Sequence, residues 1–525
     1  MAQTFSAVLL DTVSIQRYIF STNNLKENIG ASQVVEEIFD SHLKEVIKDI
    51  FSLSDERFFT EWEKNPEKIS ILENSLPLEI GYIGGGNALI FFKDETKAKE
   101  FIKKWSMRLL IYCPGLIPAC AIGKIDFQRF SEDLKILFKK LAHNKSEFIP
   151  QTIIKRHGIT AECPNTGYSA EVWCEKLPAE KQNYISSVSN AKIEASERAD
   201  DKLEKILKES GLSEKYTFTN ILDRLGQSKH EESHIAIVHI DGNDMGSRFQ
   251  SQKDLISLRK LSISVRHITL NCFKKLIRKI AENIENIKNE GINLQQAEKR
   301  TILPIRPIII GGDDITFVSD GRLGVWLAKI FLEEFEREKP SDGKPLTACA
   351  GVAITKTKYP FYRGYRLCEE LTGNAKKQRR NRKDDGSWID FHIAYGGFSG
   401  NLEEIRNNFY KAPSVDSLLM RPYKISDLNE LLKGISEFKE KKEDKNKFPR
   451  SKLMRLKEVL YYGEKEHENF LREINTRGLK LPSYKEFKGE KIVLNKTTPY
   501  FDMIELMEFY PDFALKGGSS WKHTL

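Results

Sequence analysis

Three aspartates in two short segments could bind divalent cations. Residues 308–317 read IIIGGDDITF, which places Asp313 and Asp314 in a tight turn between two apolar runs and indicates a hairpin of buried strands. Asp241 ends a second apolar run, HIAIVHID, at residues 234–241. If these strands are neighbours in one sheet, the three carboxylates converge on one edge, where they repel one another unless a cation lies between them. Carboxylate oxygens are the ligands that Mg²⁺ and Mn²⁺ prefer.

The residues beside these acids suit a nucleoside triphosphate. Two divalent ions about 4 Å apart can activate a 3′-hydroxyl and stabilise a departing pyrophosphate. Gly311 and Gly312 allow the tight turn and leave space for phosphates close to the backbone. Gly242 and Asn243 precede a predicted helix, whose first amide groups could cradle phosphates.

A basic helix end follows the second acidic segment. Leu367, Leu371 and Ala375 repeat at helical spacing, which places Lys376 at the C-terminal end of a helix, where it could reach a triphosphate as a point charge. Six of the eight residues 376–383 are Lys or Arg. This run is compatible with an RNA or phosphate contact and equally with a solvated basic loop.

An alternative exists for the segment DGND, residues 241–244. It is good turn chemistry, so Asp241 and Asp244 could simply form a turn and cap a helix. Their pairing with GGDD in the expected order favours a metal site. The predicted site comprises the catalytic acids Asp241, Asp313 and Asp314, the further metal ligand Asp244, and the nucleotide-binding residues Gly242, Asn243, Gly311, Gly312 and Lys376.

The chain contains an internal repeat. The first pair is IGGGNALI, which begins at residue 83, and IGGDDITF, which begins at residue 310. The second pair is AVLLD, which ends at Asp11, and IVHID, which ends at Asp241. The third pair is PACAIGKI, which begins at residue 118, and TACAGVAI, which begins at residue 347. The three pairs have nearly the same offset, which predicts two copies of one domain. In the first copy Gly86 and Asn87 occupy the positions of the paired acids, and a single aspartate cannot hold two divalent ions. We therefore expect a non-catalytic first copy; nucleotide binding at its glycine-rich edge and a scaffolding role both remain open.

Each copy has the order strand, helix, hairpin, helix, strand, which predicts an α/β (α+β) fold of two ferredoxin-like palm domains with helices on one face of each sheet. The predicted domains are a degenerate first palm at 1–135, a mostly helical linker at 136–230, the catalytic second palm at 231–395 and a C-terminal helical domain at 396–525.

Composition narrows the class further. The chain has 525 residues, is 40% hydrophobic and 30% charged, and has a net charge of +8, a mild basic excess that fits nucleotides or nucleic acid without being diagnostic. No apolar run of about 18 residues and no signal peptide are evident, so we expect no membrane contact and a cytoplasmic location. His157, Cys163 and Cys174 lack a CxxC pair and an evident fourth ligand, so zinc is not expected. His239 is expected to be a packed strand residue.

These segments resemble the large subunit of type III CRISPR effector complexes. The similar segments are HIDGNDMGSRF, IIIGGDDITF and AGVAITKTKYPFYRGYRLCEELTGNAKK for its second palm, DTVSIQRYIF and YIGGGNALIFF for its degenerate first palm, and FPRSKLMRLKEVLYYG for its C-terminal helices. The resemblance implies a two-palm enzyme that turns ATP into a signalling nucleotide, usually a cyclic oligoadenylate, when guide RNA pairs with target RNA in a multi-subunit complex. It also implies metal binding by Asp241, Asp313 and Asp314, and a triphosphate contact by Lys376.

The chain departs from the family pattern at two places. The usual DGDN is DGND here, so Asn243 replaces an acid and Asp244 an amide, which leaves the second ligand of this motif open. The sequence has no His-Asp dipeptide, so we expect a compact form without the HD nuclease. Two other functions compete with nucleotidyl transfer between ATP molecules: a non-catalytic RNA-binding scaffold, and ATP-dependent adenylylation of a different acceptor.

Overall fold

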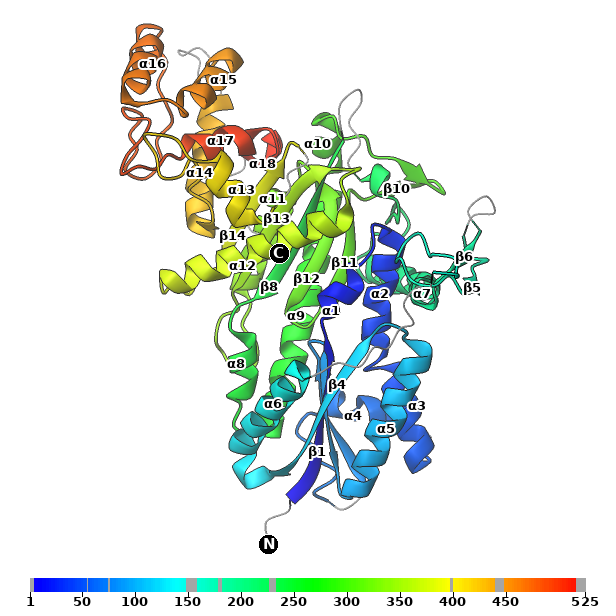
Figure 1. Ribbon diagram of the computed structural model, residues 1–525. Coiled ribbons are helices and arrows are strands. Elements are labelled where there is room, and N and C mark those ends of the chain that lie inside the picture. Colours follow the sequence, from blue (N-terminus) through cyan, green and yellow to red (C-terminus); the bar gives the residue numbers. More distant parts are fainter. Residues whose placement is uncertain are drawn as a thin grey trace.

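Two sheet-containing domains lie end to end in the molecule, with a helical domain beyond the second. The computed structural model describes residues 4–53, 55–73, 76–147, 158–177, 182–225, 233–396, 400–439 and 448–515. In Figure 1 the first palm (blue to cyan) lies at the bottom, the second (green to yellow) above it, and the C-terminal helices (orange to red) at the far end. The mixed α/β fold class is confirmed.

The first palm is an antiparallel sheet with the strand order β2-β3-β1-β4. Its strands are β1 (Thr4–Val13), β2 (Leu78–Gly84), β3 (Asn87–Phe92) and β4 (Ile117–Asp126). Its helices are α1 (Ile15–Ile19), α2 (Leu25–Glu37), α3 (Ser41–Phe51), α4 (Arg57–Lys64), α5 (Glu95–Tyr112) and α6 (Phe130–Ser146). Helix α6 packs on β4 and runs through the predicted boundary at residue 135, because its apolar face completes the core of this sheet.

The second palm repeats this order as β11-β12-β8-β13 and adds two strands, β14 and β15. Its strands are β8 (His234–Gly242), β11 (Ile305–Gly311), β12 (Asp314–Asp320), β13 (Ala348–Lys356), β14 (Trp388–Ala394) and β15 (Tyr423–Lys424). Its helices are α8 (Met245–Gln250), α9 (Leu255–Glu282), α10 (Ile284–Asn289), α11 (Gly324–Arg337) and α12 (Phe361–Asn381). A short sheet of β7 (Tyr216–Thr217), β9 (Gln296–Ala297) and β10 (Arg300–Ile302) lies beside it.

Both palms carry a register irregularity at the same repeat position. In the first hairpin it falls between Ile80 and Tyr82, and in the second between Pro307 and Ile309. The first residues of the two irregularities differ by the same 227 positions as Gly84 and Gly311, which end the matching strands. The two sheets are therefore built alike in detail as well as in strand order.

Helices cover both faces of the second sheet, whereas the sequence predicted one covered face. Successive side chains of a strand point to opposite faces, and β8 is apolar on both. Gly324 of α11 packs closely on Ala236, while Gly364 of α12 packs on Ile237, on the other face. The two-sided burial follows from the nearly continuous apolar run of β8.

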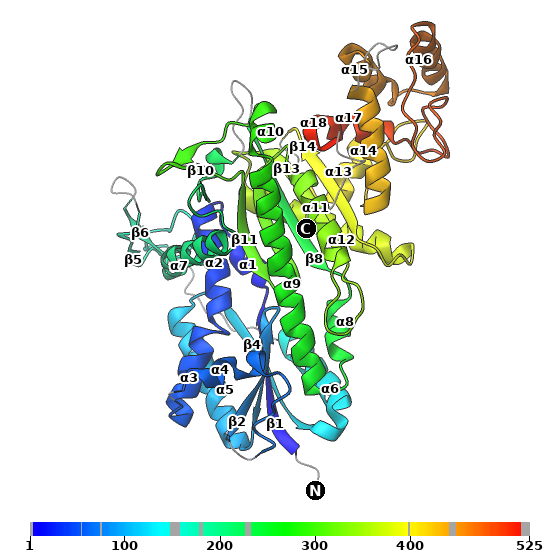
Figure 2. The same ribbon diagram turned by 180° about the vertical axis from the view of Figure 1, so that it is seen from behind.

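Helix α9 joins the two palms (Figure 2). It packs on β11 of the second palm and on β2 and α4 of the first. Arg259, which is fully buried, donates to the carbonyl oxygens of Gly81, Ile80 and Lys68 and to the carboxylate of Glu79. The second palm thus completes the hydrogen bonding of the first palm's hairpin.

The linker contains one long helix, α7 (Ser187–Glu209), which packs tightly on α2. A Cβ at Gly30 would lie 1.6 Å from the carbonyl oxygen of Lys192, so these helices meet backbone to backbone. The described part of the linker also contains β5 (Val172–Trp173), β6 (Tyr184–Ile185), the strand β7 already given, and a 3₁₀ turn at Leu222–Arg224.

The C-terminal helices are α13 (Leu402–Phe409), α14 (Ile425–Lys439), α15 (Arg450–Val459), α16 (Glu464–Thr476), α17 (Tyr500–Met507) and α18 (Asp512–Leu515). Arg421 anchors them: it is fully buried and pairs with Asp502 and Glu505 of α17. None of the helices that the structure describes has both the length and the apolar character needed to cross a bilayer.

Candidate functional site

The structure brings Asp241, Asp313 and Asp314 together at one edge of the second sheet. Strand β8 pairs with β12 so that Asp241 lies directly opposite Asp314, and Asp313 lies in the turn that precedes β12. One carboxylate oxygen from each of the three lies within 4.8 Å of the other two. The antiparallel register therefore makes one acidic cluster of two segments about seventy residues apart in the chain.

Among the residues that the structure describes, one cationic side chain is in direct contact with the cluster. The ammonium group of Lys376, on α12, contacts the carboxylate of Asp241 and donates to the carbonyl oxygen of Gly242 at 3.2 Å. Although burial alone would raise the pKa of Asp241, Lys376 and hydrogen bonding keep it below its ordinary value. Burial and the charge of Asp241 raise the pKa of Asp313 to about 6, and burial and the other two acids raise that of Asp314 well above its usual range. The site holds more negative charge than Lys376 can neutralise.

This arrangement suits a hard divalent cation. Oδ1 of Asp314 is buried and has no hydrogen-bond partner, so it is available as a ligand. Three carboxylates with one lysine leave the excess negative charge that a Mg²⁺ or Mn²⁺ ion neutralises. Gly242 leaves room for the acids, because a Cβ there would lie 2.6 Å from Oδ2 of Asp313.

The side chains of Asp244 and Asn243 have partners outside the cluster. Asp244 adopts the left-handed conformation, with φ of 58°, and its carboxylate pairs with Arg379 of α12. Asn243 donates from its side chain to the hydroxyl of Thr347 at 3.1 Å, and its Oδ1 is buried without a partner. The structure therefore groups three of the four predicted metal ligands and holds the fourth in an ion pair.

The turn of the acidic hairpin touches the first palm. Gly312 has φ of +57°, and a Cβ there would lie 2.9 Å from the Cα of Gly85. The hydroxyl of Thr269, on α9, donates to the carbonyl oxygen of Gly312 at 2.7 Å. Gly311, in contrast, has open space where a Cβ would be.

The first palm has the same framework without the paired acids. Gly86 and Asn87 follow Gly85 in its turn, and the carboxylate of Asp11 pairs with Lys145 of α6 at 2.9 Å. Lys145 precedes Lys376 by 231 residues, close to the repeat offset, so the lysine is duplicated as well. Extending the repeat past the third strand would have found it in the sequence.

His239 is a packed strand residue, as expected. Its Nδ1 lies 2.8 Å from the hydroxyl of Thr316, and burial lowers its pKa to about 4, so the ring is neutral near pH 7. Tyr365 of α12 lies edge-on to this ring and donates to the side chain of Gln16 in the first palm. This contact between the palms lies beside the acidic cluster and has no counterpart among the sequence motifs.

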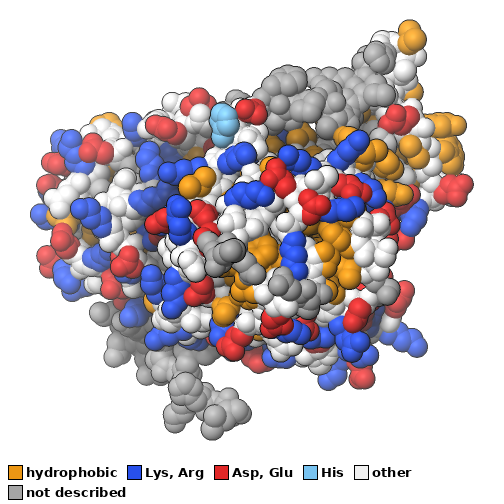
Figure 3. All heavy atoms as spheres, turned by 90° about the horizontal axis from the view of Figure 1, so that it is seen from below, with side chains coloured by type: hydrophobic (Ala, Val, Ile, Leu, Met, Phe, Trp, Pro, Cys, Tyr) orange, Lys and Arg blue, Asp and Glu red, His pale blue; other side chains and the backbone are white. Residues whose placement is uncertain are grey.

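Some basic side chains of residues 376–383 contact acids at the site, and others are exposed to solvent. Lys376 and Arg379 turn toward Asp241 and Asp244. The side chains of Lys377, Arg380 and Arg382 are exposed. On the face in Figure 3, Lys and Arg side chains are interspersed with Asp and Glu, so that face shows no continuous basic stripe.

The cysteines of the linker are buried in a small apolar cluster. Cys163 and Cys174 pack with Ile185 and Ile193, and His157 lies outside the described residues. Among the described residues, one group of acids, histidines or cysteines is close enough to share a metal ion, and it consists of Asp241, Asp313 and Asp314.

Comparison with known proteins agrees with this geometry. Residues 234–384, which include the three aspartates and Lys376, match the family model of the Cas10/Cmr2 second palm domain. This segment is similar to the second palm domain of Cas10/Cmr2. The chain's resemblance to the large subunit of type III complexes, which the motifs indicated, is confirmed. No curated protein matches the chain in sequence.

The whole chain is also similar in fold to solved structures of Csm1. A Csm1–Csm4 cassette in complex with AMPPNP matches with a TM-score of 0.57 and 14% identity, over 97% of this chain and 70% of that chain. A Csm1–Csm4 cassette in complex with cA4 matches with a TM-score of 0.54 and 13% identity, over 96% of this chain and 70% of that chain. Csm1 of T. onnurineus matches with a TM-score of 0.55 and 13% identity, over 97% of this chain and 70% of that chain. At such identities the likeness concerns the fold, which here extends over both palms.

Proposed function

We propose that this chain is a metal-dependent nucleotidyltransferase that makes a signalling nucleotide, a cyclic oligoadenylate, from ATP. In this proposal it is the large subunit of a type III CRISPR complex, activated when guide RNA pairs with target RNA. The observation that carries the catalytic part is the convergence of Asp241, Asp313 and Asp314 with a single lysine. A set of acids with no role in metal binding would be costly to hold together, because like charges at this distance repel.

Each residue has a distinct role in the proposed reaction. Asp241, Asp313 and Asp314 would hold Mg²⁺ or Mn²⁺, which when bound would lower the pKa of the attacking 3′-hydroxyl and stabilise charge on the leaving pyrophosphate. The 3′-oxygen of one nucleotide forms a bond to the α-phosphorus of another, the bond from that phosphorus to the bridging oxygen breaks, and the hydroxyl proton passes to solvent. When ATP binds, the ammonium group of Lys376 leaves the carboxylate of Asp241 and contacts the triphosphate as a point charge.

The first palm supports this site without adding acids to it. Its Asp11 pairs with Lys145 as Asp241 pairs with Lys376, but Gly86 and Asn87 stand where the second palm has Asp313 and Asp314. Its glycine-rich turn instead contacts the turn of the catalytic hairpin at Gly312. We therefore assign the chemistry to the second palm and a supporting role to the first.

The similar structures support the proposed substrate and partners. Those proteins are Csm1–Csm4 cassettes whose complexes contain AMPPNP, cA3 or cA4, and one belongs to the type III-A CRISPR-Csm interference complex. A chain of the same fold with an intact acidic hairpin is expected to bind ATP and to assemble with other protein subunits and RNA.

Product analysis tests the proposal. The purified chain, alone and in its complex with guide RNA and target RNA, is incubated with ATP and Mg²⁺ or Mn²⁺, and the products are identified by mass spectrometry. We expect oligoadenylate and pyrophosphate from the native chain and none from the double variant Asp313→Asn with Asp314→Asn. Asp55→Asn, at an exposed acid paired only with Arg57, is the control that should keep full activity. Undiminished product from the double variant would refute the assignment, and AMP joined to another acceptor would replace oligoadenylate as the product.

A further inference from the structure

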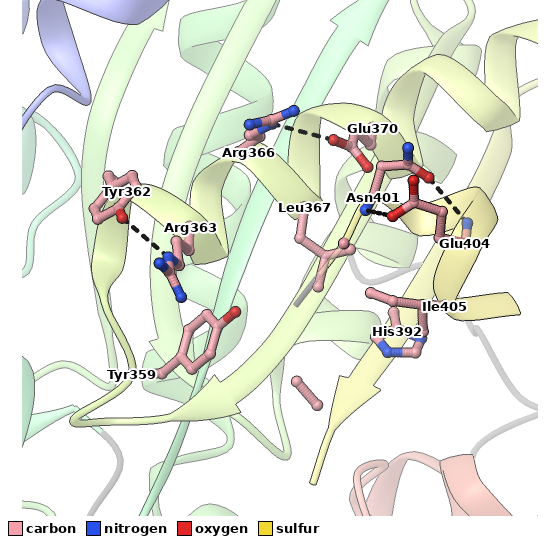
Figure 4. A pocket seen from close by; sticks show the side chains of 12 residues that line it. Tyr359, Tyr362, Arg363, Arg366, Leu367, Glu370, His392, Asn401, Glu404 and Ile405 are labelled. Atoms are coloured by element: carbon pink, nitrogen blue, oxygen red, sulfur yellow. Dashed lines mark hydrogen bonds and ion pairs between the residues drawn. The ribbon is translucent and has the colours of Figure 1, made fainter. Parts of the chain in front are cut away.

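A cavity lies on the far flank of α12 from the acidic cluster. It has a volume of about 470 Å³ and lies between α12, β14 and the start of α13 (Figure 4). The side chain of Lys376 points from α12 to Asp241 of the acidic cluster and that of Arg379 to Asp244, whereas Arg363, Arg366 and Leu367 of the same helix line this cavity. The two sites are therefore separate and share one helix.

The floor of the cavity is apolar and fixed. Leu367, Ala394 and Ile405 form it together with the fully buried ring of His392. They come from a helix, a strand of the palm sheet and the first helix of the C-terminal domain. Since these elements are packed into the core, the cavity is part of the folded framework rather than a gap between mobile side chains.

One end of the cavity presents aromatic and cationic groups. Tyr359, Tyr362 and Arg363 lie together there, and Arg363 donates to the hydroxyl of Tyr362 at 2.9 Å (Figure 4). The ring of Tyr362 remains 40% exposed. Arg363 forms no ion pair with any residue that the structure describes, so its charge is free to meet an anion. An exposed tyrosine, Tyr362, and the half-buried Tyr359 beside a guanidinium group suit stacking on a planar base and contact with a phosphate.

The carboxylates at the other end already have partners. Glu370 accepts from Arg366 at 3.3 Å and from the backbone amide of Leu402 at 2.7 Å. Glu404 accepts from the backbone amide of Asn401 at 3.2 Å in a capping box. These acids hold the start of α13 in place, and Asn401 adds an amide that can bond the edge of a base. Repulsion of an incoming phosphate by these acids is reduced, because both are engaged.

We propose that this cavity binds a nucleotide unit, with its base against Tyr359 and Tyr362 and its phosphate at Arg363. The volume lies within the range of about 300–1,000 Å³ that is usual for small-molecule sites. The unit is either a free mononucleotide or one residue of single-stranded RNA, since both present the same base and phosphate. This binding site does not depend on the proposed catalytic function.

Direct binding measurements test the proposal without turnover. The full-length chain carries Asp313→Asn and Asp314→Asn and is kept in EDTA, so that metal-dependent binding at the acidic cluster does not contribute. AMP is titrated by calorimetry, and a 5′-fluorescein single-stranded A10 RNA by anisotropy. Two changes are added separately in the cavity: Arg363→Glu and the charge-neutral Tyr362→Ala.

Two matched controls lie in the C-terminal domain, on α16 and in the turn before it, at residues that do not line the cavity. Arg472→Glu reverses an exposed arginine in an i,i+4 pair with Glu468, and Tyr462→Ala removes a tyrosine that is 50% exposed. We expect Arg363→Glu to weaken binding at least tenfold and Tyr362→Ala at least threefold, with both controls within twofold of the parent. Melting temperatures check that all four variants fold.

The pattern across the two probes identifies the source of the nucleotide. Loss of AMP binding points to a free nucleotide, and loss of RNA binding alone points to a strand. Binding of neither probe by the parent chain would overturn the proposal. Equal binding by the cavity variants and their controls would overturn it as well.

Discussion

Gly85 and Gly312 touch, so the glycine-rich turns of the two palms meet tip to tip. Position 312 has a positive φ, and a Cβ there would lie 2.9 Å from the Cα of Gly85. The neighbouring Gly311 has neither constraint, as its Cβ would meet open space. The contact places the degenerate hairpin directly against the hairpin that carries Asp313 and Asp314.

Substitution of Gly312 by alanine should therefore destabilise the protein. The backbone strain costs about 1–3 kcal/mol, and the clash with backbone atoms of Gly85 cannot be relieved by a side-chain rotation. Thermal unfolding should show a clear fall in melting temperature for Gly312→Ala and little change for Gly311→Ala. Equal melting temperatures for the two variants would show that the turns do not touch in solution.

Removal of the lysine in the acidic cluster should strengthen metal binding and weaken ATP binding. Lys376→Met deletes the cation that competes with a metal for Asp241. Unit charges 4 Å apart interact by about 4 kcal/mol near a protein surface, and a fraction of this would tighten Mn²⁺ binding by roughly tenfold. Calorimetry with Mn²⁺ and with ATP measures both effects, and Lys377→Met, at the exposed neighbouring lysine, is the control. Weaker binding of both Mn²⁺ and ATP would contradict the opposing roles given to Lys376.

The acidic cluster should make the metal-free protein less stable as the pH rises through about 6. Burial and Asp241 raise the folded-state pKa of Asp313 to about 6, from an ordinary value near 3.8. A raised pKa favours the protonated folded form, so this contribution to stability is complete below about pH 4 and is lost as the pH passes 6.

Melting curves at pH 5 and pH 7.5, in EDTA and in Mn²⁺, measure this dependence. The native protein should lose more stability than Asp313→Asn over that range in EDTA, and Mn²⁺ should restore it chiefly at the higher pH. The opposite sign, with the native chain gaining stability relative to the variant, would refute the raised pKa.

Arg259 should hold the two palms together. It is fully buried on α9 and reaches the first palm's hairpin, where Glu79 is its ionic partner. Arg259→Met leaves that carboxylate buried and unpaired, which costs about 3–5 kcal/mol. Lys260→Met, beside it on the solvent side and paired with the exposed Glu67, should cost far less. Chemical denaturation of both variants measures the difference, and similar midpoints would show that Arg259 contributes little.

Much of the architecture follows from local patterns. Alternating and continuous apolar runs located the strands, and the repeat predicted that Asp241 and the paired acids of GGDD would share an edge, where the register indeed places them. Helical spacing placed Lys376 toward the end of α12, and the structure adds its contact with Asp241.

The remaining features depend on long-range packing. Asp244 pairs with Arg379 because a left-handed turn directs its carboxylate toward α12, and no spacing rule reveals that direction. The contact of Gly312 with Gly85 joins residues more than two hundred positions apart and needs the relative placement of the palms. The cavity beside Arg363 needs three elements that are apart in the sequence, so its residues look like ordinary surface positions.

The matched irregularities at Ile80–Tyr82 and Pro307–Ile309 bear on the ancestry of the molecule. An extra residue at one place in a hairpin is an unusual event, and two independent insertions at the same place are far less plausible than one that was copied. The single ancestral domain therefore already had it before duplication. The two copies meet at the tips of these same hairpins, so one structural unit was duplicated and also forms the contact between the two palms.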